Sequence, residues 1–487
     1  MSEEVRQLEP KAVWKNFTAL NKVPRPSKKE ERIIQFMLNF GQSLGLETFT
    51  DSVGNVIIRK PATKGMEDRK VVTLQSHLDM VHQKNADTNF DFGTEGIQMI
   101  VDNDWVKAKG TTLGADNGMG VAAIMTLLEG ADIPHPELEA LFTIDEETGM
   151  TGAMGLEAGV LQGEILLNLD TEEDDELDIG CAGGIDVTAR CSYTEKPTPA
   201  DVKAYKIFIT GLNGGHSGIE IHKGLGNANK IMNRLLYHTA LKHTIRIAMI
   251  DGGSLRNAIP RESSAIIVVD KSDVSDFEAD FTILETILKS ELLFLEPKLS
   301  IVLDACESPK MVMEPSSQEK LLKGLYAVHN GVYAMSAAIP DLVETSNNMA
   351  RVEVSGGEIT IGCLTRSSVD SAKMDLAHML RSTFELAGCT VTFDGDYPGW
   401  QPNPNSEILE VLKKKYESLF NEKPKVAACH AGLECGILGQ NYPDMDMISF
   451  GPTIKGAHSP DERVSISSVQ KFWKFLLAVL KDIPKKK

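Results

Sequence analysis

The chain has 487 residues, of which 42% are hydrophobic, and this length favours two or three domains over a single core. Its 69 acidic and 50 basic residues give a net charge of −19, which argues against binding to nucleic acid or to an anionic membrane surface. The N-terminus has no signal-peptide pattern and no apolar run approaches the roughly 20 residues of a membrane helix, so a cytoplasmic location is expected.

The first strong pattern predicts an amphipathic helix over about residues 28–44. Ser27 and Glu30 have the spacing of a capping box, in which the two side chains would satisfy the first free N–H groups of the helix. Apolar residues then recur at helical spacing on one face, and Gly45 follows the last of them. The segment is therefore expected to pack one face against a core.

A strand is expected at Val71–Gln75, directly before a short polar segment that contains His77 and Asp79. Because side chains alternate along an extended chain, these two would point to the same side. A Gly-rich loop follows further on and leads into an apolar helix, with Asp116 near the helix N-terminus. Each of these acids and histidines lies at the end of an element, where two elements can bring their side chains together.

Two apolar strands end in acids. The run from Leu141 continues into Asp145, Glu146 and Glu147, and a later strand ends at Asp170. Adjacent carboxylates repel one another and resist desolvation, so a stable fold needs either a cation beside them or open water around them. Strands separated by helices, with polar residues at the strand ends, are typical of an α/β layer fold.

The chain changes character near residue 185, where alternating strand-like and helical runs begin. These runs predict an inserted α+β domain over residues 186–394. A segment rich in proline and glycine over 397–404 marks the return, so the α/β domain is expected to comprise residues 1–185 and 395–487. The seven cysteines include no Cys-x-x-Cys pair, and their odd number favours reduced thiols over a disulfide framework.

Acids and histidines at element ends are the types of side chain that bind Zn²⁺, Mn²⁺ or Co²⁺. One carboxylate can bridge two ions about 3.5–4 Å apart. Such a pair would neutralise the acids, polarise a carbonyl oxygen and lower the pKa of a bound water to about 7. The set that could converge in this way is His77, Asp79, Asp116, Glu146, Glu147, Asp170 and, far downstream, His458.

The order of these residues, and the segments Gln75–Met80, Gly214–Gly218, Leu255–Pro260 and His430–Cys435, resemble the M20 clan of cocatalytic metallopeptidases. Within it they are most similar to the peptidase D branch, the cytosolic aminoacyl-histidine (Xaa-His) dipeptidases that also cleave carnosine-type substrates. The resemblance implies an α/β, mixed-sheet di-metal exopeptidase catalytic domain with an inserted α+β lid domain. It also implies a cytoplasmic homodimer, joined through the lid, that acts on small dipeptides.

The same resemblance implies a role for each residue of the set. Two divalent cations are expected, Zn²⁺ first, with Mn²⁺ and Co²⁺ as alternatives. Asp116 would bridge them, Asp79 would orient His77, and Glu146 would be the general base. The remaining metal ligands would be His77 with Asp170 on one ion and Glu147 with His458 on the other.

Further residues are implied in substrate binding. His216 in the lid would stabilise the oxyanion, and Asn257 and Arg366 would hold the substrate, the arginine through a free C-terminal carboxylate. Gly432 and Glu434 are weaker candidates for the substrate pocket.

Several alternatives stay open from the residues alone. Asp116 could be a helix N-cap, Arg366 a surface ion pair and Gly214–Gly218 a plain turn. Composition does not decide which of Glu146 and Glu147 faces a metal. The rival functions are an M20-type deacylase or carboxypeptidase acting on N-acyl amino acids and, from another class, a non-catalytic metal-binding scaffold.

Overall fold

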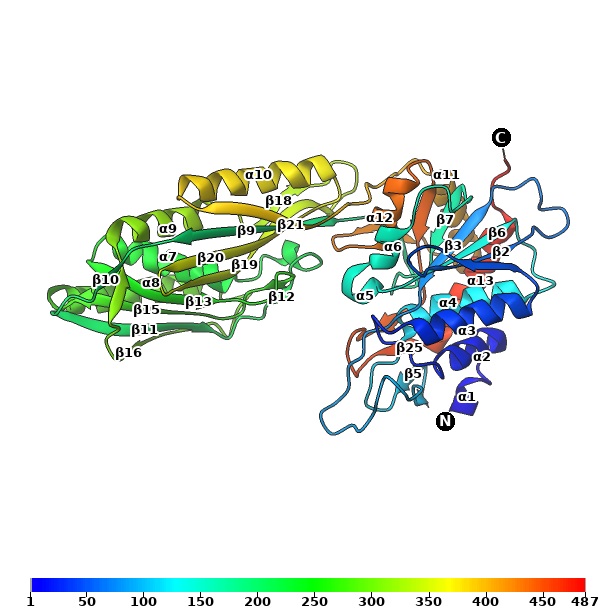
Figure 1. The fold of residues 1–487 in the computed structure, drawn as a ribbon, viewed down its shortest axis with the longest axis horizontal. Helices are drawn as coiled ribbons and strands as arrows, with labels where there is room; N and C mark the ends of the chain where they lie inside the picture. Colours follow the sequence, from blue (N-terminus) through cyan, green and yellow to red (C-terminus); the bar gives the residue numbers. More distant parts are fainter. Residues whose placement is uncertain (1, 487) are drawn as a thin grey trace. The chain divides into compact units, whose positions relative to one another are not determined.

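The computed structural model describes residues 2–486, which form two compact units (Figure 1). Unit 1 comprises Met1–Gly180, Trp400–Ala428 and Leu433–Lys487, and unit 2 comprises Cys181–Gly399 and Cys429–Gly432. The unit limits differ from the predicted boundaries at 185 and 395 by about five residues, and residues 429–432, which were predicted in the α/β domain, lie in unit 2. This short segment belongs to unit 2 because the Ala182 N–H approaches the carbonyls of Cys429 and Ala431.

Unit 1 contains an eight-stranded mixed sheet, which confirms the predicted fold class. The strand order is β1-β2-β6-β3-β7-β23-β8-β22. The inner pairs β3–β6, β3–β7 and β7–β23 are parallel, whereas β1–β2, β2–β6 and β23–β8 are antiparallel. The strands are β1 Glu47–Thr50, β2 Val56–Lys60, β3 Val72–His77, β6 Leu138–Thr143, β7 Ile165–Asn168, β8 Glu176–Cys181, β22 Lys425–Cys429 and β23 Asp446–Ser449.

Helices and a small second sheet complete unit 1. The four-stranded sheet has the order β24-β25-β5-β4, with strands Ile454–Lys455, Arg463–Ser465, Trp105–Ala108 and Met99–Asp102. The helices are α1 Ser2–Val5, α2 Lys11–Leu20, α3 Glu31–Ser43, α4 Ala115–Glu129, α5 Glu146–Gly149, α6 Thr151–Gly155, α11 Glu407–Phe420, α12 Glu434–Asn441 and α13 Ile466–Lys481.

Helix α4 is apolar on every side because both α2 and β3 pack against it. Its approach to the strand ends depends on a glycine. A Cβ on Gly120 would lie 2.4 Å from Ser76 Oγ and 2.7 Å from the Leu169 carbonyl oxygen, so no larger residue fits without movement. The close packing brings the first turn of α4, with Asp116, to the ends of β3 and β7.

Unit 2 is an antiparallel α+β layer, as predicted. Its main sheet has the order β16-β11-β15-β13-β19-β20-β9-β21, with β18 beside β19. Helices α7 to α10 pack on it through one buried apolar core. The elements are β9 Gly183–Ser192, β11 Val202–Thr210, β13 Ile245–Gly252, β15 Ser263–Asp270, β16 Ser300–Ala305, β18 Gly331–Met335, β19 Val343–Ser355, β20 Glu358–Ser367, β21 Thr390–Tyr397, α7 Ala228–Ala240, α8 Val274–Glu291, α9 Pro315–Ala327 and α10 Asp370–Leu386.

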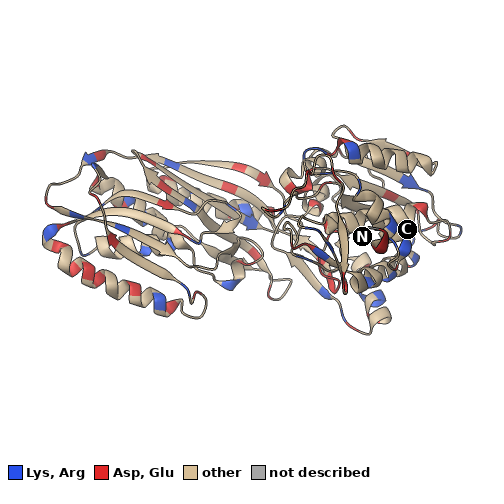
Figure 2. Cartoon of the chain, turned by 90° about the horizontal axis from the view of Figure 1, so that it is seen from below, with Lys and Arg blue, Asp and Glu red and all other residues tan. Residues whose placement is uncertain are grey.

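Short elements complete unit 2. They are the strand pairs β10 Glu195–Pro197 with β17 Met311–Met313 and β12 Gly215–His216 with β14 Ala258–Ile259, and the 3-10 turns Ile221–Lys223 and Lys271–Asp273. Acidic and basic residues are interspersed along the elements of both units (Figure 2). Among the helices over residues 2–486, none has both the length and the apolar character needed to cross a membrane.

Cys191 and Cys389 form a disulfide, so the expectation that all thiols are reduced was wrong. The two residues are 198 positions apart in the sequence, but β9 and β21 are antiparallel neighbours in which Arg190 lies opposite Thr390. The pairing therefore follows from sheet register, which a count of cysteines and their spacing does not contain.

Candidate functional site

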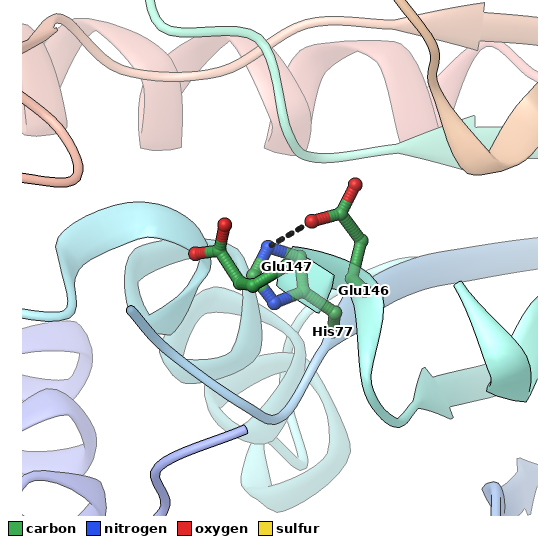
Figure 3. A group of neighbouring side chains, drawn as sticks. All are labelled: His77, Glu146 and Glu147. Carbon is green, nitrogen blue, oxygen red and sulfur yellow. Dashed lines mark ion pairs between the residues drawn. The ribbon is translucent and has the colours of Figure 1, made fainter. Parts of the chain in front are cut away.

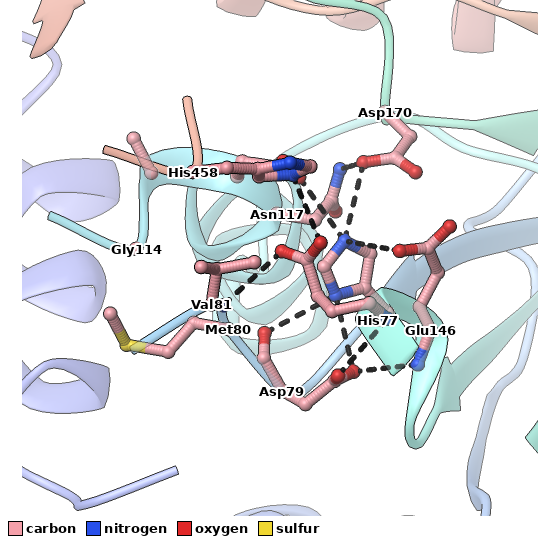
Figure 4. Close-up of polar contacts among 12 residues, drawn as sticks. His77, Asp79, Met80, Val81, Gly114, Asn117, Glu146, Asp170 and His458 are labelled. Atoms are coloured by element: carbon pink, nitrogen blue, oxygen red, sulfur yellow. Dashed lines mark hydrogen bonds and ion pairs between the residues drawn. The ribbon is translucent and has the colours of Figure 1, made fainter. Parts of the chain in front are cut away.

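Three neighbouring strands of unit 1 deliver acids and a histidine to one edge of the sheet. His77 is the last residue of β3, Glu146 and Glu147 begin α5 just after β6, and Asp170 lies two residues beyond β7. Because β6, β3 and β7 are parallel neighbours, their carboxyl ends meet there (Figure 4).

The two ring nitrogens of His77 face different partners. Its Nδ1 lies 3.2 Å from the Asp79 carbonyl oxygen and 3.4 Å from the Asp79 carboxylate. Its Nε2 lies 3.1 Å from Asp116 Oδ1 and 3.6 Å from Asp170 Oδ1. The nitrogen that faces the other ligand candidates is therefore Nε2.

Asp116 stands between two histidines, and each of its oxygens faces a different one. Oδ1 is 3.1 Å from His77 Nε2 and Oδ2 is 3.1 Å from His458 Nε2, which in turn lies 2.9 Å from Glu147 Oε2. Of the groups with ligand spacing among the described residues, two share this one carboxylate. They are His77, Asp116 and Asp170, and Asp116, Glu147 and His458.

The two adjacent glutamates take different positions. Their carboxyl groups lie on different sides of the His77 ring (Figure 3). Glu147 contacts His458, whereas Glu146 Oε2 has His77 Nε2 as a neighbour at 4.0 Å and belongs to neither group around Asp116. The composition of the acidic run could not distinguish the two glutamates in this way.

The electrostatics show that the acids and histidines depend on one another. Burial lowers the pKa of His77, but Asp170 and the other carboxylates outweigh it and raise that pKa well above its usual value. Hydrogen bonds that His458 donates to the Asp116 and Glu147 carboxylates raise the pKa of His458 to about 11. Burial raises the pKa of Asp170 to about 8 and that of Glu146 well above its usual value. Cations among the carboxylates would remove these penalties.

Asp79 organises the backbone around the site in addition to its contact with His77. Its carboxylate accepts from the backbone N–H groups of Glu146, at 3.0 Å, and Glu147, at 3.2 Å. It also accepts from Ser27 Oγ at 2.8 Å. The capping-box interpretation of Ser27 was therefore wrong: α3 begins without a side-chain cap, because this hydroxyl is used on Asp79.

Two further positioning residues were missed from the sequence. The buried Glu462 carboxylate accepts four backbone N–H groups, from Leu113 to Asp116, at 2.6 to 3.3 Å. The buried Arg25 guanidinium donates to the Leu78, Asp79 and Gly114 carbonyls. Glu462 follows His458 by four residues, and that proximity was the one available signal; Arg25 gave none.

In unit 2, the position of the His216 proton follows from its contacts. Nδ1 accepts from the N–H groups of Gly218, at 3.2 Å, and Ile219, at 3.1 Å, so the hydrogen of the neutral ring is on Nε2. Burial and the Arg366 guanidinium lower the pKa of His216 to about 4. His216 therefore offers one N–H donor at neutral pH. Asn257, in the loop before β14, is exposed, and its carbonyl accepts from the Ser217 N–H.

Arg366 on β20 is 5% exposed, which excludes the surface ion pair considered above. Its Nη1 donates to Tyr397 Oη at 2.7 Å, whereas Nε is buried and has no hydrogen-bond partner among the described residues. Nearby, His430 Nε2 contacts Ser346 Oγ at 2.8 Å. A guanidinium held in place by a tyrosine and left with an unused donor is suited to an anionic ligand.

Gly432 and Glu434, two residues apart, belong to different units. Gly432 is half-buried in unit 2. Glu434 is fully buried in unit 1, where its Oε2 accepts from Gln75 Nε2 at 2.6 Å and Thr143 Oγ1 at 2.7 Å. The side chain exposes no surface and its partners belong to β3 and β6, and its place in a substrate pocket stays a prediction.

Comparison with known proteins gives consistent matches over nearly the whole chain. The model of peptidase family M20/M25/M40 matches residues 73–482. The cytosol non-specific dipeptidase of Escherichia coli (strain K12) is 44% identical over 483 residues, 99% of this chain and 100% of the relative. The crystal structure of aminoacylhistidine dipeptidase from Vibrio alginolyticus has a TM-score of 0.93 and 43% identity, covering 100% of both chains. A tripeptidase from Staphylococcus aureus, with a TM-score of 0.57 and 15% identity over 98% of this chain and 99% of the other, shares the fold alone.

Proposed function

Since this chain belongs to peptidase family M20/M25/M40, we propose that it is a metal-dependent dipeptidase that hydrolyses Xaa-His and other dipeptides, carnosine-type ones included. The names of the Escherichia coli and Vibrio alginolyticus relatives support the substrate class. The observation that carries the proposal is the Asp116 carboxylate, whose two oxygens each face one histidine of a separate ligand group.

The donor set fits two divalent cations. Each group offers one imidazole nitrogen and carboxylate oxygens, the donors that Zn²⁺ prefers and that Mn²⁺ and Co²⁺ also accept. We propose Zn²⁺ as the first choice, held by His77, Asp116 and Asp170 and by Asp116, Glu147 and His458. When bound, the ions would polarise the scissile carbonyl and acidify a water molecule.

Glu146 is the proposed general base. It lies beside His77 and outside the two groups that share Asp116, although it also forms a group of ligand spacing with His77 and Glu147. We propose that its carboxylate stays free of the ions and is available for proton transfer. It would take the proton of the attacking water and later give it to the leaving amine. Asp79 would support this role by holding the Glu146 N–H and the His77 ring.

Unit 2 is proposed as the lid that completes the substrate site. The Nε2–H of His216 would donate to the oxyanion, since Nδ1 is already occupied by two backbone N–H groups. Arg366, positioned by Tyr397, would bind the free C-terminal carboxylate of the substrate, with Asn257 and Gly432 beside it.

Replacing Arg366 by Ala is expected to raise KM for a dipeptide about 10- to 100-fold, with little change in kcat, because a hydrogen bond to a charged group contributes about 1.5–3 kcal/mol. Steady-state kinetics on a dipeptide and on its C-terminal amide measure the effect. Arg351→Ala, on the neighbouring strand β19, is the matched control and should behave as wild type. An equal loss on the amide would contradict the carboxylate role.

A substrate panel should separate this activity from its rivals. Xaa-His dipeptides are expected to be cleaved at least about 100-fold more efficiently than N-acetyl amino acids. Both substrates offer a carboxylate to Arg366 and a scissile carbonyl to the ions, so recognition of the free amine, which only the dipeptide has, would make the difference. The panel is run with metal-free protein to which Zn²⁺, Mn²⁺ or Co²⁺ is added separately. Preference for N-acyl amino acids would identify a deacylase or carboxypeptidase, and no hydrolysis with any ion would identify a metal-binding scaffold.

The protein is also proposed to be a cytoplasmic homodimer that associates through unit 2. The cytoplasmic location is supported by the name of the Escherichia coli relative and the dimer by the resemblance described above. Sedimentation at several protein concentrations would measure the association, and a monomer at all of them would refute it.

A further inference from the structure

Six polar side chains form a continuous row across the sheet of unit 1, at its buried middle. Four members lie on adjacent strands: Gln75 is opposite Asn168, and Ser449 is opposite both Asn168 and Asp178. The other two are Glu434, the first residue of α12, and Thr171, in the segment after β7. All six are buried, four of them completely. We call this the polar row, and its members, in order, are Glu434, Gln75, Asn168, Ser449, Thr171 and Asp178.

Hydrogen bonds connect the row from end to end. Gln75 Nε2 donates to Glu434 Oε2 at 2.6 Å, and Gln75 Oε1 accepts from Asn168 Nδ2. Asn168 Oδ1 accepts from Ser449 Oγ. Ser449 Oγ and Thr171 Oγ1 are 2.8 Å apart, as are Thr171 Oγ1 and Asp178 Oδ2. The row therefore joins β3, β7, β23 and β8 through side chains in addition to the backbone ladder.

The row has too few hydrogens unless one terminal carboxyl is protonated. The Ser449 hydrogen is used on Asn168, so the Ser449–Thr171 contact needs the Thr171 hydrogen. Thr171 then has none for Asp178, which must supply its own. If the side-chain amides of Gln75 and Asn168 are both rotated by 180°, every hydrogen bond of the row runs in the opposite direction and the proton belongs to Glu434 instead. In either direction, at least one end is a carboxylic acid.

The electrostatics of the two ends agree with this count. Burial raises the pKa of Asp178 to about 6, with Glu176 on the same strand acting in the same direction. Burial raises the pKa of Glu434 to about 7, opposed by the nearby His77 and increased by Asp79. Both carboxyls therefore hold a proton more readily than usual.

The row lies directly behind the proposed metal ligands. Gln75 precedes His77 by two residues and Asn168 precedes Asp170 by two. A buried polar group that is left unpaired destabilises the fold, a cost that apolar side chains at the same strand positions would avoid. Such a row specifies one strand register and one strand separation, since each hydrogen bond forms only when its donor and acceptor are at the right distance.

We propose that the polar row is a positioning device that fixes the ends of β3 and β7, so that His77 and Asp170 stand together beside Asp116 and bind the first cation. This inference rests on the proposed function, because it assigns the row to that same metal site. Its members act through His77 and Asp170, which follow Gln75 and Asn168 in the sequence.

The test compares Asn168→Ala and Ser449→Ala with wild type. Zn²⁺ affinity, measured by competition with a chromophoric chelator, is expected to fall about 10- to 100-fold at one of two sites, the range found for residues that orient metal ligands. At saturating Zn²⁺, kcat should fall while KM for a dipeptide stays the same. Asn233→Ala, a buried asparagine in α7 of unit 2, is the matched control for the loss of a buried amide.

The outcomes separate this inference from the proposed function. Unchanged Zn²⁺ affinity in both row variants, with a fall in Tm like that of Asn233→Ala, would overturn the positioning role even if wild type is an active dipeptidase. Wild type that binds two Zn²⁺ but hydrolyses no dipeptide would overturn the function and leave the row to be judged by affinity. Ser449→Ala removes one hydroxyl, so it keeps the test available if Asn168→Ala does not fold.

An infrared measurement tests the proton count. The Zn²⁺-loaded wild type should show a protonated-carboxyl band that Asp178→Asn combined with Glu434→Gln removes. A wild type without the band, or a double variant that keeps it, would contradict the proton assigned to the row.

Discussion

Replacing Glu146 by Gln is expected to lower kcat for dipeptide hydrolysis by about 10²–10⁴, the usual contribution of a general acid–base group. The amide has the size of the carboxyl group but does not take up a proton from water. Since Glu146 belongs to neither group around Asp116, the variant should still bind two cations per chain. Turnover on an Xaa-His dipeptide and metal content by elemental analysis measure the two effects.

The control for this variant is Glu157→Gln, an exposed glutamate of unit 1, which should hydrolyse dipeptides at the parental rate. If Glu146→Gln keeps the parental rate with both cations bound, another group accepts the proton. If it loses a cation, Glu146 is a ligand and its assignment must be exchanged with that of Glu147.

Replacing Asp116 by Asn is expected to abolish tight binding of both cations, whereas Asp170→Asn should lose only one. The difference follows from the geometry, since Asp116 places one oxygen toward His77 and the other toward His458, and Asp170 contacts only the His77 side. An amide presents a single oxygen and carries no charge to bridge two ions. Metal content after gel filtration in metal-free buffer gives the stoichiometry directly.

Activity should follow the metal content. Asp116→Asn is expected to be inactive at any ion concentration that leaves wild type saturated, and a chelator should inactivate wild type until Zn²⁺ is returned. Equal stoichiometry in Asp116→Asn and Asp170→Asn would refute the bridging role.

Much of the proposed metal centre could be predicted from the sequence because the end of a buried strand is visible as the change from apolar to acidic residues. The run ending in Glu146 and Glu147 and the run ending at Asp170 are apolar segments interrupted by acids, and the structure places both at one sheet edge. His458 gives no such signal, since it is 342 residues from Asp116, and only the family resemblance connected the two. Local sequence patterns indicate where a strand lies and ends, whereas the fold topology decides which distant side chains come together.

Other features depend on contacts that no local pattern contains. Glu434 looked like a loop residue beside Gly432, but its carboxyl enters the sheet between Gln75 and Thr143. Ser27 has the spacing of a helix cap, but its hydroxyl donates to Asp79 instead, because the backbone of Ser27 is bonded to Met80 just after β3. In both cases a tertiary hydrogen bond overrides the local interpretation.

The Glu462 carboxylate, which accepts four backbone N–H groups from residues 113–116, joins segments that lie 346 to 349 positions apart in the sequence. Closing so long a loop costs chain entropy, and contacts between distant segments form late in folding. We therefore expect the loop that carries Asp116 to become ordered late, after the local helices and strands of unit 1 have formed.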